Sequence, residues 1–263
     1  MTLLSDTRYL FVRYLRKLVR TPILLFFSLF QPILFLALFT QLLTKLSNFP
    51  GILPDHVSYL EFAAAGILLQ NAFGSALQSG NSIVADIDSG FLQKMLVSPV
   101  SRPAILLGRL SSDALRVVVQ TAIILGLAYV FGVVENTPFS VNTGIVGILL
   151  VFFTLAFFGL AWSGISLALG MRTRSSETVF AIGGVITFPL LFLSSALLPI
   201  NFLPSWVGTV SMFNPVSYAV DACRALMING YIWSTILPAW GVIGLVALIT
   251  MSATLYQFRK VVR

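Results

Sequence analysis

Long apolar stretches alternate along the chain with short charged segments. Five stretches contain no Lys, Arg, Asp or Glu, and they cover residues 22–44, 62–85, 143–170, 178–197 and 236–257. A sixth is uncharged only from 117 to 134, so we expect its helix to begin earlier, near residue 112. About 20 apolar residues cross the hydrocarbon core of a bilayer. The pattern therefore predicts an all-α, polytopic membrane protein with six transmembrane helices in a single transmembrane domain, residues 1–263.

The first 20 residues predict an amphipathic helix that lies in the membrane interface. Arg13, Arg16, Lys17 and Arg20 recur at helical spacing and form one basic stripe, while Phe11, Leu15 and Leu18 lie on another face. An alternative interpretation is a basic flank that only fixes the orientation of the first span.

The segment before the last span has two interpretations. Residues 178–220 are uncharged and long enough for two crossings, but Pro199, Pro204 and Pro215 interrupt the second half. Both chain ends are basic, and the positive-inside rule favours placing both in the cytoplasm. We therefore expect residues 198–235 to form short outer re-entrant helices. With this topology 14 of the 16 Lys and Arg residues are cytoplasmic, and Lys45 and Arg224 are outside.

Composition supports the membrane class and excludes several others. Hydrophobic residues make up 57% of the chain, charged residues 10%, and the mean hydropathy is +0.95. The net charge of +7 follows from basic residues beside apolar runs, so it indicates topology and not a nucleic-acid partner. A single cysteine, Cys223, excludes an intrachain disulfide, and His56 has no neighbouring ligand residue at metal-binding spacing.

The sequence offers no chemistry of its own for an energy source. It contains no P-loop, no G-x-S-x-G and no H-E-x-x-H motif, so we expect no cofactor bound by this chain and no enzymatic activity in it. We also expect no buried carboxylate or lysine inside the spans, which argues against a proton-driven mechanism.

Polar amides in the second span have two interpretations. Gln70, Asn71 and Gln78 lie among small residues, and amides in a span face other helices or a cavity. They either join helices or line a translocation path, and the sequence does not choose between the two.

Residues 86–111 form the longest charged segment between apolar ones, and we expect a cytoplasmic coupling loop there. Phe91, Leu92, Met95 and Leu96 share one face of a short helix that ends before Pro99. Such an apolar ridge fits a groove on a partner protein, or it rests on the lipid interface. Ser101 is a candidate N-cap for the helix that leads into the third span.

Two stretches resemble the permeases of type-2 ABC exporters, of the multidrug and daunorubicin-resistance kind. The first is Asp86-Ile-Asp-Ser-Gly-Phe-Leu-Gln-Lys-Met-Leu-Val-Ser-Pro-Val-Ser-Arg102, although Phe91 stands where the family commonly has Thr. The second runs from Leu198 to Trp206 and from Asn214 to Arg224.

The resemblance implies partners, a location and a role. Two copies of the chain, or the chain and a sister, would form a dimer in the cell membrane among membrane lipids, and two separate ATPase subunits would bind ATP and Mg²⁺. The complex would move an amphipathic drug, a lipid-like molecule or a glycan outward; a secondary transporter or channel is the alternative. The implied coupling residues are Asp86, Asp88, Gly90, Phe91, Leu92, Met95, Leu96, Pro99 and Arg102 of the loop, with Arg13, Arg16 and Lys17 of the first helix.

Overall fold

The computed structural model describes residues 3–43, 57–134, 137 and 139–261, and over these residues all regular secondary structure is helical. Lys45 and His56, for which the sequence makes predictions, lie outside the described residues. The helices are α1 (Leu3–Val19), α2 (Pro22–Leu43), α3 (Tyr59–Asp88), α4 (Phe91–Val97), α5 (Arg102–Val134), α6 (Gly144–Thr173), α7 (Ser176–Phe192), the 3₁₀ helix η2 (Ile200–Phe202), α8 (Ser205–Ser211), α9 (Pro215–Arg224), the π-helix η3 (Ala225–Asn229) and α10 (Trp233–Val261).

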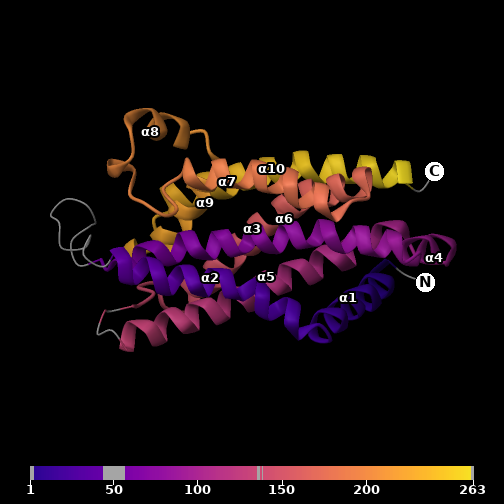
Figure 1. Ribbon diagram of the computed structural model, residues 1–263, viewed down its shortest axis with the longest axis horizontal. Coiled ribbons are helices and arrows are strands. Elements are labelled where there is room, and N and C mark those ends of the chain that lie inside the picture. Colours follow the sequence, from indigo (N-terminus) through magenta and orange to yellow (C-terminus); the bar gives the residue numbers. More distant parts are fainter. Residues whose placement is uncertain (1–2, 44–56, 135–136, 138, 262–263) are drawn as a thin grey trace.

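The long helices run side by side as one bundle (Figure 1). Helix α1 begins and α10 ends at the end of the bundle that carries α4, whereas α8 lies at the opposite end. Both ends of the described chain therefore lie at the same end of the bundle, as an even number of crossings predicts.

Every predicted span coincides with a helix, but only four helices in the described chain are long and apolar enough to cross a membrane. These are Tyr59–Asp88, Arg102–Val134, Gly144–Thr173 and Trp233–Lys260. Two shorter apolar helical segments, Phe26–Leu42 and Ser176–Phe192, correspond to the first and fifth predicted spans. The count of six crossings remains a prediction.

Helix α3 is the central element of the bundle. It packs against α2, α5, α6, α7 and α9, and most of its residues are buried. A capping box at its N-terminus, in which Ser58 and Glu61 bond to each other's backbone N–H, fixes where it begins. Gly80 allows its close approach to α6, because a Cβ there would lie 2.5 Å from the carbonyl oxygen of Ser166.

The predicted coupling loop 86–111 is mostly helical. Asp86 belongs to the last turns of α3, and residues from Arg102 onward already belong to α5. Only the turn at Ser89–Gly90 and the residues from Ser98 to Ser101 connect helices, and Gly90 adopts a left-handed φ of 67° that turns the chain into α4. The helices at Phe91–Val97 and from Arg102 onward agree with the short helix and the helix after Ser101 that the sequence predicted, and the structure pairs several charges of this segment inside the bundle.

The predicted outer segment contains only short helices. Helix α8 has 7 residues and α9 has 10, so neither approaches the length of a crossing. They are followed by the five-residue π-helix η3 before α10 begins.

Candidate functional site

A buried carboxylate joins three helices near the α4 end of the bundle. The side chain of Asp86 on α3 is 2% exposed and forms a short ion pair with Arg109 of α5. The Asp86 carboxylate also accepts hydrogen bonds from Lys17 Nζ at 3.3 Å and Tyr14 Oη at 3.3 Å, both on α1. Arg13 Nη2 lies 3.8 Å from the same group. We call Arg13, Tyr14, Lys17, Asp86 and Arg109 the Asp86 cluster.

A second ionic group joins α3 and α5 one to two helical turns further along the bundle. Arg116 donates to Asp113 Oδ1 at 2.8 Å, to Ser75 Oγ at 2.9 Å and to the Ser75 carbonyl at 2.6 Å. Ser79 makes a short hydrogen bond to the other oxygen of Asp113. Both carboxylate oxygens of Asp113 are therefore occupied.

Asp86 is buried one residue beyond the predicted second span, and Asp113, inside the predicted third span, is half-buried. Asp86 and Asp113 lie within helices that meet the length and hydropathy of a membrane span. The sequence did not reveal them because each ion is paired with a residue on another helix or one turn away, and pairing lowers the cost of burial.

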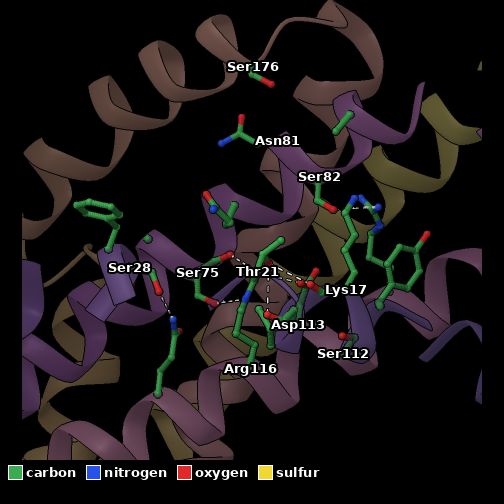
Figure 2. A pocket seen from close by; sticks show the side chains of 18 of the residues that line it. Lys17, Thr21, Ser28, Ser75, Asn81, Ser82, Ser112, Asp113, Arg116 and Ser176 are labelled. Carbon is green, nitrogen blue, oxygen red and sulfur yellow. Dashed lines mark hydrogen bonds and ion pairs between the residues drawn. The ribbon is translucent and has the colours of Figure 1, made fainter. Parts of the chain in front are cut away.

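A pocket of about 570 Å³ lies beside these ions, between the α1–α2 junction, α3, α5 and the start of α7. We call it the polar pocket (Figure 2). One part of its wall is polar, with Lys17, Asn81, Ser82, Arg109 and Arg116, and another part is apolar, with Leu18, Phe27 and Phe180. The pocket is thus amphipathic.

The three residues predicted to line a translocation path, Gln70, Asn71 and Gln78, have different surroundings in the structure. Gln78 lines the polar pocket. Asn71 Nδ2 instead donates to Gln120 Oε1 at 3.4 Å, and Gln120 in turn donates to Ser28 Oγ at 2.8 Å, so this chain of amides joins α3, α5 and α2. Gln70 is buried, and in the described structure its Oε1 has no hydrogen-bond partner. Asn71 fits the packing interpretation, and Gln78 the lining one.

The apolar ridge of α4 faces its own chain. Leu92 is fully buried and Met95 nearly so, in a small core shared with Leu10 of α1 and Ile105 of α5. Phe91 is half-buried beneath the guanidinium of Arg13, whose Cζ lies 3.3 Å from the ring centroid. The apolar ridge is therefore not a free docking face for a partner protein, as the sequence had suggested. The residues that α4 exposes are Gln93, Lys94 and Val97.

The other predicted coupling residues divide by exposure. Arg16, Asp88, Pro99 and Arg102 are exposed, Leu96 and Gly90 are half-buried, and Asp86 belongs to the buried cluster. The expected N-cap at Ser101 is absent, since the Ser101 hydroxyl has no partner among the described residues.

Sequence reasoning missed Asp6, which fastens α1 to the start of α5. Its carboxylate is buried and accepts a hydrogen bond from the backbone N–H of Ser101 at 3.0 Å. The buried residues of α1 are Asp6, Leu10 and Tyr14, on the helix that packs against α5, whereas Phe11, Leu15 and Leu18 of the predicted apolar face are half-buried. The one carboxylate in an otherwise basic first helix was the available signal.

At the opposite end of the bundle, Asp221 and Arg224 form an ion pair at 3.4 Å, three residues apart in the chain. Arg224 also donates to the carbonyls of Ser195 at 2.8 Å and Phe62 at 3.3 Å. Burial lowers the pKa of Arg224 to about 10, and Asp221 partly offsets that effect. The pair ties α9 to α3 and to the end of α7.

Comparison with known proteins adds a family match and several relatives. The model of the family described as ABC-2 type transporter matches residues 5–228. The transport permease ycf38 of Porphyra purpurea is 29% identical over 95% of this chain and 84% of its own length. The daunorubicin resistance ABC transporter permease protein DrrB1 of Streptomyces coeruleorubidus is 30% identical over 78% of this chain and 69% of its own length. The multidrug ABC transporter permease YbhR of Escherichia coli (strain K12) is 21% identical over 74% of this chain and 50% of its own length.

Proposed function

This chain belongs to the ABC-2 type transporter family and is a transmembrane subunit of an ABC transporter, and we propose that it works as the permease of an ATP-driven exporter. Two copies, or this chain and a sister permease, would assemble with two separate ATPase subunits that bind ATP and Mg²⁺. The family match over residues 5–228 and the names of the relatives support this proposal.

The observation that carries the coupling role is the way α4 is fixed at the end of the bundle. Its inner face packs on α1 and α5, and Arg13 of α1 covers Phe91. Asp6 binds the backbone N–H of Ser101, just before α5 begins. A force on the exposed face of α4 would therefore reach α1 and the 33-residue helix α5 through packed contacts.

We propose that the α4 end faces the cytoplasm of a cell whose plasma membrane holds the protein. Helix α1 and the ends of α6 and α10 are basic, whereas Arg224 lies at the other end of the bundle. This distribution follows the positive-inside rule. Outward transport of an amphipathic drug, a lipid-like molecule or a glycan is the direction that the family resemblance implies.

A secondary transporter or channel is the second candidate function. The buried carboxylate of Asp86 and the half-buried one of Asp113 favour it, because ionisable groups inside spans often serve proton or ion pathways. Their pairing with Arg109 and Arg116 is equally consistent with a structural role.

The test uses the exposed residues of α4, because substitutions of Leu92 or Met95 would disturb the core. We expect Lys94→Glu combined with Val97→Asp to weaken co-purification with the ATPase subunits at least about tenfold, as the loss of a central contact does, and to abolish substrate-stimulated ATP hydrolysis. Val97 is 88% exposed, so the fold should persist.

The matched control is Thr209→Asp, which places a charge on exposed α8 at the opposite end of the bundle. It should leave the complex intact. Normal assembly and ATP hydrolysis in the α4 variant would refute the coupling role, and transport in vesicles that follows a proton gradient without ATP would favour the secondary transporter.

A further inference from the structure

The polar pocket has unused hydrogen-bond donors and a net positive wall. Three cations, Lys17, Arg109 and Arg116, line it together with one carboxylate, Asp113. Behind this wall Arg13 and Asp86 add one charge of each sign. An excess of positive charge in a largely apolar bundle attracts an anion.

The carboxylates of this region are already saturated. The Asp86 carboxylate accepts hydrogen bonds from Arg109, Lys17 and Tyr14. The Asp113 carboxylate accepts hydrogen bonds from Arg116 and Ser79. A cationic ligand would therefore have to displace an existing ion pair to find an acceptor. This argues against a cation as the preferred ligand of the pocket.

Donors, by contrast, remain without partners. In the described structure two buried donors, the Nε of Arg109 and the Nδ2 of Asn81, make no hydrogen bond, and neither does the acceptor Oδ1 of Asn81. Both residues line the pocket, and Figure 2 shows Asn81 between Ser82 and Ser176 with no bond drawn to it. The side chain of Lys17 is 44% exposed, and it shares the Asp86 carboxylate with Arg13 and Arg109. Burying an unsatisfied donor has a free-energy cost, which a ligand with several acceptor oxygens would remove.

The apolar part of the wall reaches the outside of the bundle. Phe27 of α2 and Phe180 of α7 line the pocket and are also largely exposed on the surface that α2 and α7 present. A ligand whose polar group occupies the pocket can therefore extend an apolar chain past these rings toward the surrounding lipid.

We propose that the polar pocket binds the phosphate group of an acidic amphiphile, with Lys17, Asn81 and Arg109 as donors and Phe27 and Phe180 along its apolar chain. This inference rests on the proposed function, because it names the substrate class of the exporter. A phosphate presents more acceptor oxygens than a carboxylate, and donors from three helices, α1, α3 and α5, line the pocket.

Calorimetric titration of the purified chain in maltoside micelles tests the binding. We expect dihexanoyl phosphatidic acid to bind with a Kd at least about tenfold lower than dihexanoyl phosphatidylcholine, dodecyltrimethylammonium or inorganic phosphate, corresponding to at least one charge-assisted hydrogen bond. Equal affinity for the ammonium or the choline compound would overturn the anion preference. Inorganic phosphate binding as tightly as the lipid would overturn the amphiphile and indicate a free phosphate.

Two variants locate the site. Lys17→Gln and Asn81→Leu should each raise the Kd for dihexanoyl phosphatidic acid about tenfold, and Asn81→Leu keeps the assay informative if Lys17→Gln does not fold. Arg16→Gln is the matched control, since it removes one charge from an exposed position of the same helix outside the pocket. Unchanged affinity in both pocket variants would refute this site.

A final measurement separates substrate from resident lipid. In the complex with its ATPase, dihexanoyl phosphatidic acid should stimulate ATP hydrolysis, and Asn81→Leu should shift that stimulation to higher lipid concentration. Binding without stimulation would overturn the substrate assignment. Failure of the complex to form would instead contradict the proposed function, while the binding results for the chain alone would still stand.

Discussion

At the scale of single residues, Asp86 and Asp88 show how far two neighbouring acids can differ. Both stand in the acidic positions of the family-like loop, and the sequence assigns them the same coupling role. In the structure Asp86 is buried among Arg13, Lys17 and Arg109, whereas Asp88 is exposed. Two residues apart on a helix, they point to different sides.

Asp86→Asn should destabilise the protein, and Asp88→Asn should not. The first substitution leaves Arg109 buried without its anion, and breaking a buried pair in this way costs about 3–5 kcal/mol. The second changes a charge in water, where effects are about 0.5 kcal/mol or less. Thermal unfolding of both variants in the same detergent measures the difference, and equal melting temperatures would show that the Asp86 cluster contributes little stability.

At the scale of elements, the sequence predicted the long helices but not the ion pairs between them. Each uncharged stretch forms a helix because a backbone in lipid must satisfy its own hydrogen bonds. The pair of Asp86 and Arg109 was not predicted because hydropathy registers the two charges but not their pairing across 23 positions.

The amphipathic pattern of α4 was recognised correctly, but its partner was not. Leu92 and Met95 do share a buried face, and that face packs on α1 and α5 of the same chain. Periodicity alone shows that a helix face is apolar, and only the tertiary structure shows what covers it. The same holds for Asn71 and Gln78, which look alike in sequence and have different neighbours.

Gly80→Ala should weaken the contact between α3 and α6, whereas Gly74→Ala on the same helix should be tolerated. A Cβ at position 80 would lie 2.5 Å from a backbone oxygen of Ser166, while position 74 has no atom within 4 Å. Overpacking of this kind costs about 1–3 kcal/mol. Unfolding in denaturant compares the two variants; a loss of stability in Gly74→Ala alone would contradict the close approach of these helices.

At the scale of the whole molecule, the two ends of the bundle carry different features. Helix α4, the Asp86 cluster and the ends of α1 and α10 lie toward one end, and α8 and the Asp221–Arg224 pair lie toward the other. An exporter with this arrangement would receive its ATPase at the α4 end and release substrate at the α8 end.

Because the chain has a single, buried cysteine, cysteine labelling can measure on which side of the membrane each end of the bundle lies. Burial raises the pKa of Cys223 to about 12, so at pH 8 its thiol stays protonated and unreactive toward maleimides. Wild-type protein should therefore label only on unfolding. In sealed vesicles an impermeant maleimide should label Lys94→Cys and Thr209→Cys from opposite sides of the membrane. Labelling of both from one side would refute the proposed topology.

The pairing of α3 with α5 also has a consequence for biosynthesis. Ser75 and Asp86 precede Arg109 and Arg116 in the chain, so a ribosome completes the acceptors before it makes the cations. Lys17 and Tyr14 are made earlier still and are available to Asp86 as soon as α3 emerges. Arg109 and Arg116 are thus synthesised after groups that accept their hydrogen bonds, so the order of translation would limit the time for which either charge lacks a partner.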